Sequence, residues 1–112
     1  MNYDLTILKQ IIITAAREEL LPRFADVQRS TKMDGSFVTE ADLAVQSRIT
    51  RELQQHYPDS ALLGEEMTAD EQAELLTNSA SLWCLDPLDG TSNFAVGTPY
   101  YAISLALIER GV

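Results

Sequence analysis

Two pairs of acidic residues stand where they could share a metal cation. Asp86 and Asp89 directly follow the apolar run Leu82–Leu85, and the pair Glu65-Glu66 follows the apolar run Ala61–Leu63. If both runs are neighbouring strands, the four carboxylates lie close together, and clustered like charges are costly without a cation between them. Carboxylate oxygens suit a hard divalent ion such as Mg²⁺. The spacing therefore indicates a metal site.

The segment Asp86-Pro87-Leu88-Asp89-Gly90-Thr91 has the composition of a tight turn that could also hold an anion. Thr91 adds a hydroxyl, and the backbone N–H groups of Gly90 and Thr91 could face a phosphate. Taken alone, Asp-Pro-x-Asp-Gly is also ordinary turn chemistry. An EF-hand loop is excluded because the twelfth position from Asp86 is Gly97, where that loop needs Glu.

Two helices are predicted in the first half of the chain. Apolar residues recur at helical spacing from Asp4 to Leu21, and Pro22 is expected to end that helix. The segment Thr39-Glu40-Ala41-Asp42 fits a capping box, so a second helix is expected to begin after Thr39 and to stop before Tyr57-Pro58-Asp59. On this pattern alone, Asp42 is a capping acid.

Three strands are expected in the second half. They cover Ala61–Leu63, Leu82–Leu85 and Tyr100–Ile108, and the acidic stretch Thr68–Asn78 is expected to be a surface loop or a short helix. Cys84 is expected to be a core residue.

Composition limits the possible partners and the compartment. Eight basic against seventeen acidic residues give a net charge of −9, which disfavours binding to nucleic acid or to an anionic membrane surface. The apolar stretch Ile11–Ala16 is too short to span a bilayer. A single cysteine and the lack of a signal peptide favour the cytoplasm.

The segment Trp83–Phe94 resembles the signature of the inositol monophosphatase family, Asp-Pro-x-Asp-Gly-Thr-x-Asn-Phe. Lys32 followed by Val38-Thr39-Glu40-Ala41-Asp42 is similar to the family's Lys…Val-Thr-x-x-Asp segment, and Leu63-Gly64-Glu65-Glu66 to its Gly-Glu-Glu. The resemblance implies an α+β fold, a two-layer sandwich of helices on a largely antiparallel sheet. It also implies hydrolysis of small phosphomonoesters with two or three Mg²⁺ ions, inhibited by lithium.

The resemblance also implies roles for individual residues. Glu65, Asp86, Asp89 and the Leu88 carbonyl would bind metal, with Glu66 as a supporting acid. Thr91, paired with Asp42, would activate water for attack on phosphorus, and the N–H groups of Gly90 and Thr91 would hold the phosphate.

Members of that family are well over twice as long as this chain. Their second half supplies another metal-binding aspartate in a Trp-Asp-x-Ala-like motif, which is not found in residues 1–112. The chain is therefore expected to be a single partial domain, from a protein that forms a homodimer at full length. The substrate alcohol stays open between inositol, histidinol, nucleotide and sugar phosphates. The alternative is a non-catalytic module that binds metal or another protein.

Overall fold

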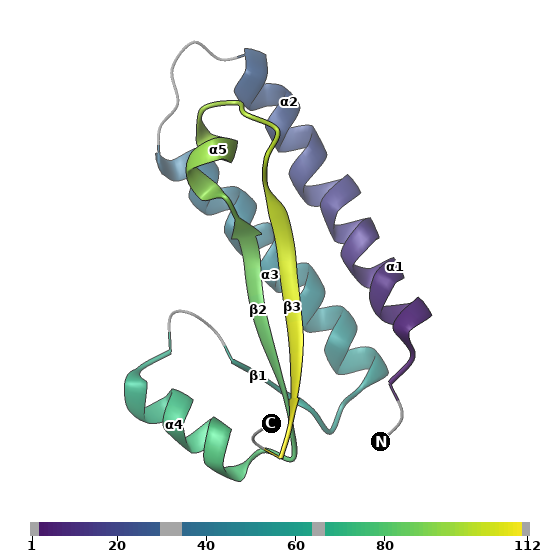
Figure 1. Cartoon of the computed structure of the whole chain (residues 1–112). Helices are drawn as coiled ribbons and strands as arrows, with labels where there is room; N and C mark the ends of the chain where they lie inside the picture. The colour runs from purple at the N-terminus through teal and green to yellow at the C-terminus, as the bar shows by residue number, and fades with distance from the viewer. Residues whose placement is uncertain (1–2, 30–34, 64–66, 111–112) are drawn as a thin grey trace.

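The computed structural model of the chain has two layers, helices on one side and a sheet on the other (Figure 1). It describes residues 3–29, 35–63 and 67–110, and the side chains of residues 3–27, 40–63 and 67–110. The elements are α1 (Leu5–Ala15), the π-helical turn η1 (Ala16–Leu20), α2 (Leu21–Arg29), α3 (Gly35–His56), β1 (Ala61–Leu63), α4 (Ala69–Asn78), β2 (Ser81–Asp89), α5 (Thr91–Ala95) and β3 (Ala102–Glu109). The predicted α+β class is confirmed. In the part of the chain that is described, no helix is both long and apolar enough to cross a bilayer.

The first helical stretch continues past Pro22, so the prediction that Pro22 ends it was wrong. In η1 the helix widens, and the N–H of Leu21 donates to the carbonyl of Ala16, five residues earlier. Pro22 is the second residue of α2 and is exposed. Proline is tolerated in the first turn of a helix, where its missing N–H is not needed, and the π turn makes this position equivalent to a new helix start.

The π turn also keeps one apolar stripe against the core. The buried residues of the stretch are Ile11, Ala15, Leu20, Phe24 and Val27, with steps of four, five, four and three residues. A regular α-helix accommodates steps of three and four on one face, but not five. The five-residue step falls where the helix widens.

Helix α3 begins at Gly35, which makes the predicted start after Thr39 wrong. Thr39 lies inside the helix, and neither proline nor a further glycine stands between Gly35 and Thr39 to prevent extension of the helix. The predicted end is confirmed. Tyr57 N–H donates to the Leu53 carbonyl at 2.7 Å, and the chain then turns at Pro58.

The core lies between the helices and one face of the sheet. Helix α3 contributes a stripe at four-residue spacing, in which each side chain is at most 2 % exposed: Ala41, Val45, Ile49 and Leu53. Trp83, Leu85 and Leu88 of β2 belong to the same cluster. This packing fixes which face of β2 points inward.

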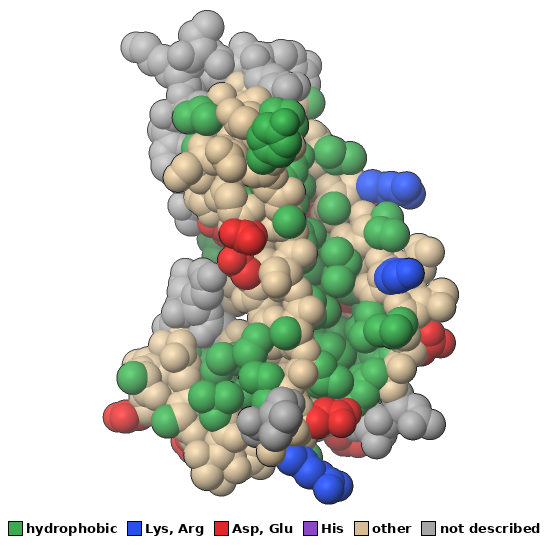
Figure 2. Space-filling model, in the orientation of Figure 1, with side chains coloured by type: hydrophobic (Ala, Val, Ile, Leu, Met, Phe, Trp, Pro, Cys, Tyr) green, Lys and Arg blue, Asp and Glu red, His purple; other side chains and the backbone are tan. Residues whose placement is uncertain are grey.

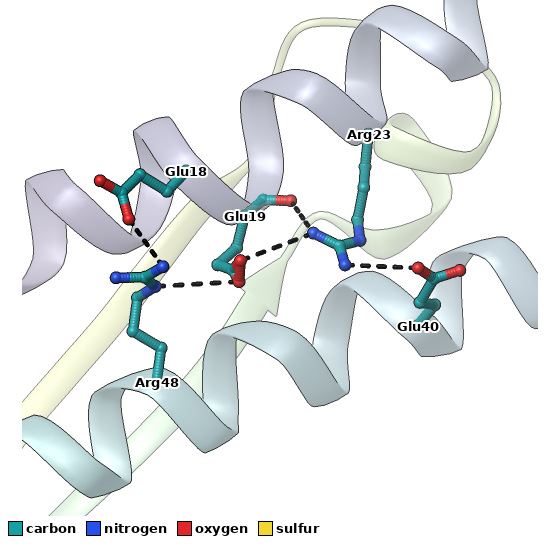
Figure 3. Close-up of polar contacts among 5 residues, drawn as sticks. All are labelled: Glu18, Glu19, Arg23, Glu40 and Arg48. Carbon is teal, nitrogen blue, oxygen red and sulfur yellow. Dashed lines mark hydrogen bonds and ion pairs between the residues drawn. The ribbon is translucent and has the colours of Figure 1, made fainter.

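A chain of ion pairs joins α3 to the π turn and α2 on the outer side of the helix layer (Figure 3). Arg48 of α3 lies 2.6 Å from Glu18 and 3.8 Å from Glu19. Arg23 of α2 donates to the Glu19 carbonyl at 2.9 Å and lies 3.3 Å from Glu40. The wide turn is therefore held from α3 by charge as well as by apolar packing.

The sheet has the strand order β1-β2-β3. β1 is parallel to β2, with Leu63 opposite Cys84, and β2 is antiparallel to β3. All three predicted strands are confirmed. The chain crosses from β1 to β2 through α4, which begins with a capping box: Thr68 Oγ1 accepts from the Glu71 N–H at 3.1 Å.

Candidate metal and phosphate site

A β-bulge in β2 turns Asp86 and Asp89 to the same face of the sheet. In a regular strand, residues three apart point to opposite faces. Here Asp86 pairs with Ser104 and Asp89 with Ala102, so three steps along β2 match two along β3. One extra residue is thus inserted between the two acids.

The burial pattern supports this geometry. Trp83 and Leu85 belong to the core, and after the bulge Leu88 does so as well, although it lies an odd number of residues from Leu85. Asp86 is half-buried and Asp89 is exposed, and neither belongs to the core cluster. Figure 2 shows acidic side chains over the end of β2, on the face turned away from the helices. Bulges commonly redirect side chains in this way beside functional sites.

Hydrogen bonds within the turn fix its backbone. The Leu88 N–H donates to Asp86 Oδ1 at 3.2 Å, and the Thr91 hydroxyl donates to the Leu88 carbonyl at 2.9 Å. Pro87 has no N–H to contribute to the β2–β3 ladder, which suits it to a bulge. One predicted metal ligand, the Leu88 carbonyl, is thus held by another predicted site residue.

Gly90 connects β2 to α5 in a left-handed conformation, with φ +90° and ψ 34°. A Cβ at this position would lie 2.7 Å from the Tyr100 carbonyl oxygen and 3.2 Å from Tyr101 Cα. The position therefore requires glycine both for its backbone angle and for the close approach of the neighbouring chain.

The remaining predicted site residues differ in what the structure says of them. Asp42 lies within α3 and is half-buried, so it does not cap the helix start. Helix α3 packs against α5, which brings the helices that carry Asp42 and Thr91 to the same end of the sheet (Figure 1). Because the recorded bond of the Thr91 hydroxyl goes to the Leu88 carbonyl, the pairing of Thr91 with Asp42 stays a prediction.

Glu65, Glu66 and Lys32 lie outside the described residues. Among the residues whose positions are described, no group of three or more Asp, Glu, His or Cys side chains could hold a metal ion. Asp86 and Asp89 supply two carboxylates, so a complete site depends on a third acid, and the first pair proposed from the sequence follows β1 directly.

A groove of about 290 Å³ adjoins Asp86 on the outward face. It is lined by Leu63, Gln72, Cys84, Leu85, Asp86, Ser104 and Ala106. Cys84 is half-buried there and does not belong to the core cluster, contrary to the prediction. The small side chains of β3 leave the carboxylate of Asp86 accessible from this side.

Sequence reasoning missed one contact that shapes the turn. The side-chain amide of Asn93 donates to the Tyr100 carbonyl at 2.9 Å. Asn93 stands in the motif that suggested the family, but Tyr100 carries no sequence signal for a contact made by its backbone. Only the path of the chain from α5 to β3 reveals it.

Comparison with known proteins gives consistent results. Residues 3–112 match the model described as the inositol monophosphatase family. The Nus factor SuhB of Xylella fastidiosa is 39% identical over 85 residues, covering 76% of this chain and 28% of its own length. The histidinol-phosphatase of Mycobacterium tuberculosis is 36% identical over 114 residues, covering 100% and 42%. The solved IMPase of Thermotoga maritima superposes with a TM-score of 0.70 at 29% identity, covering 96% and 39%. The chain thus spans less than half the length of each.

Proposed function

Because the chain belongs to the inositol monophosphatase family, we propose that it carries the metal-binding part of a Mg²⁺-dependent phosphomonoesterase. The observation that supports this best is the bulge in β2. It gives Asp86 and Asp89 a common face at the end of a strand, which a regular strand would not do. The substrate is a small phosphomonoester, and the reaction is hydrolysis of its P–O ester bond.

The donor set fits Mg²⁺. Asp86, Asp89 and the Leu88 carbonyl offer only oxygen atoms, and Mg²⁺ prefers oxygen ligands. Glu65 completes the set in this proposal, with Glu66 beside it. The support for Glu65 is the parallel pairing of β1 with β2, in which Leu63 lies opposite Cys84, two residues before Asp86. When bound, Mg²⁺ lowers the pKa of coordinated water and neutralises charge on the phosphoryl group.

The residues of the turn have separate tasks in this proposal. The N–H groups of Gly90 and Thr91 hold phosphate oxygens, and Gly90 lets the backbone approach them closely. Thr91 Oγ1 orients the attacking water and passes its proton toward Asp42. This role requires the hydroxyl to exchange its bond to the Leu88 carbonyl for one to Asp42.

The whole protein's activity needs residues beyond those described. The chain spans 28% to 42% of the two curated relatives compared above, so contacts to the substrate alcohol and a further metal ligand are assigned to the remainder. At full length we expect a lithium-sensitive, cytoplasmic homodimer. The 112-residue chain by itself should bind metal but turn over little substrate.

Calorimetric titration of the chain with Mg²⁺ tests the metal site. Asp86→Asn should abolish the binding heat, whereas Asp70→Asn should not, because Asp70 is an exposed acid in the first turn of α4. Equal binding by both variants would place any metal elsewhere and remove the basis of the proposal. An assay with an aryl phosphate separates the alternative, a non-catalytic module, which would bind Mg²⁺ yet remain inactive when the missing half is supplied.

A further inference from the structure

The segment between α5 and β3 is fastened to the turn that carries the proposed ligands. The Tyr100 carbonyl is the nearest atom to the position that a Cβ on Gly90 would occupy, at 2.7 Å. Gly90 directly follows Asp89, and Tyr100 lies two residues before Ala102, the partner of Asp89 in the ladder. The position of Tyr100 thus determines how closely β3 approaches the Asp89–Gly90 turn.

Asn93 holds this segment at two points. Its side-chain amide donates to the Tyr100 carbonyl at 2.9 Å, and its backbone carbonyl accepts from the Thr98 N–H at 2.8 Å. The Tyr100 N–H in turn donates to the Thr98 carbonyl at 2.8 Å. The Tyr100 side chain is 75 % exposed, so its ring does little to anchor the residue. The backbone of Tyr100 is therefore held chiefly through Asn93.

The chemistry of the amide suits this contact. An amide NH₂ donates without charge, whereas an ionised Asp at the same position only accepts and would repel a carbonyl oxygen. The next residue, Phe94, is fully buried, and its ring centroid lies 5.1 Å from that of Tyr101. Phe94 and Tyr101 therefore anchor the two sides of the segment in the core, while Asn93 sets the backbone position between them.

We propose that Asn93 is a positioning residue for the Asp89–Gly90 turn, acting through the Tyr100 carbonyl on the metal ligand Asp89. This inference rests on the proposed function for the ligand role of Asp89 alone. The contact between Asn93 and Tyr100, and the approach of Tyr100 to Gly90, stand independently of it.

The test combines Mn²⁺ affinity with the backbone amide signal of Gly90 in the metal-free chain. Loss of one neutral hydrogen bond predicts that Asn93→Ala weakens Mn²⁺ binding by about 3- to 10-fold. Asn93→Asp should weaken binding at least as much, and Asn93→Gln, which keeps the amide on a longer arm, should recover part of the loss. Ser92→Ala changes the exposed neighbour on α5 and should leave the affinity unchanged.

The amide of Gly90 separates failure of this inference from failure of the metal site. Asn93→Ala should shift the Gly90 signal and speed its hydrogen exchange, with little change at Leu85 in the middle of β2. An unaltered Gly90 signal in Asn93→Ala overturns the positioning role. If the unmodified chain binds no Mn²⁺ while the Gly90 signal responds as expected, the proposed metal site is lost and the positioning of the turn by Asn93 is retained.

Discussion

Replacing Gly90 with alanine should destabilise the fold strongly, although the change adds only one methyl group. Two separate costs arise at this position. The backbone has φ +90°, where an L residue with a Cβ is disfavoured. The added Cβ would also stand 2.7 Å from the Tyr100 carbonyl oxygen and 3.2 Å from Tyr101 Cα. Both neighbours are backbone atoms, so no side-chain rotation relieves the contact.

The two costs can be estimated separately. A left-handed conformation costs an L residue about 1–2 kcal/mol. Forcing apart packed neighbours costs about 1–3 kcal/mol more. The sum of about 2–5 kcal/mol is a large part of the 5–15 kcal/mol that stabilises a typical domain. For a chain of this size, it lowers the melting temperature by roughly 10 °C or more.

Urea denaturation followed by the fluorescence of the buried Trp83 measures this loss directly. Gly97→Ala is the matched control, because Gly97 has a similar φ of 77° and the variant reports the conformational cost. The difference between the two variants then measures the contact with Tyr100. If Gly90→Ala loses less than about 1 kcal/mol, or no more than Gly97→Ala, the close approach of Tyr100 to Gly90 is wrong.

Three further predictions concern the site and its surroundings. Millimolar Mg²⁺ or Mn²⁺ should raise the melting temperature of the chain but not that of Asp89→Asn, since a ligand bound only by the folded state stabilises it; an equal rise in both would contradict the ligand role. In a full-length protein, Asp42→Asn and Thr91→Ala should each lower kcat by about 10²–10⁴ with small melting shifts, and the double variant should lose little more; losses that multiply would disprove the pairing. Burial raises the pKa of the Tyr101 phenol, so the free energy of unfolding should fall as the pH rises above the ordinary value of about 10, and Tyr101→Phe should flatten that fall. Alkaline urea titrations of both proteins would check this, and identical slopes would count against it.

The elements could be predicted from the sequence where local patterns act alone. Apolar spacing located the three strands, and Tyr57-Pro58-Asp59 located the end of α3, because these signals need no knowledge of distant residues. The start of α3 was misplaced because Thr39-Glu40-Ala41-Asp42 satisfies a capping pattern that a longer helix overrides. A true capping box, Thr68 with Glu71, stood in the sequence and was not recognised.

The arrangement around the acids was less accessible to sequence reasoning. Spacing indicated that Asp86 and Asp89 could share a cation, but three-residue spacing on a strand argues against a common face unless a bulge intervenes. That bulge depends on pairing with β3, which no local pattern encodes. The contact between Asn93 and Tyr100 was hidden for the same reason. The placement of Glu65 and Glu66 stays a prediction.

The wide turn η1 has a consequence for how homologous sequences should be compared. A π turn is equivalent to an α-helix with one inserted residue, and each residue of an α-helix advances the chain by about 100° of rotation. Deleting one residue from Ala16–Leu20 would therefore rotate all of α2 by that angle relative to α1. Phe24 would leave its place beside Phe94, whose ring centroid is now 5.6 Å away, and a polar neighbour would face the core instead. A homologue with a single-residue gap at this point must have a shifted apolar pattern in every position that follows, up to the end of the helix.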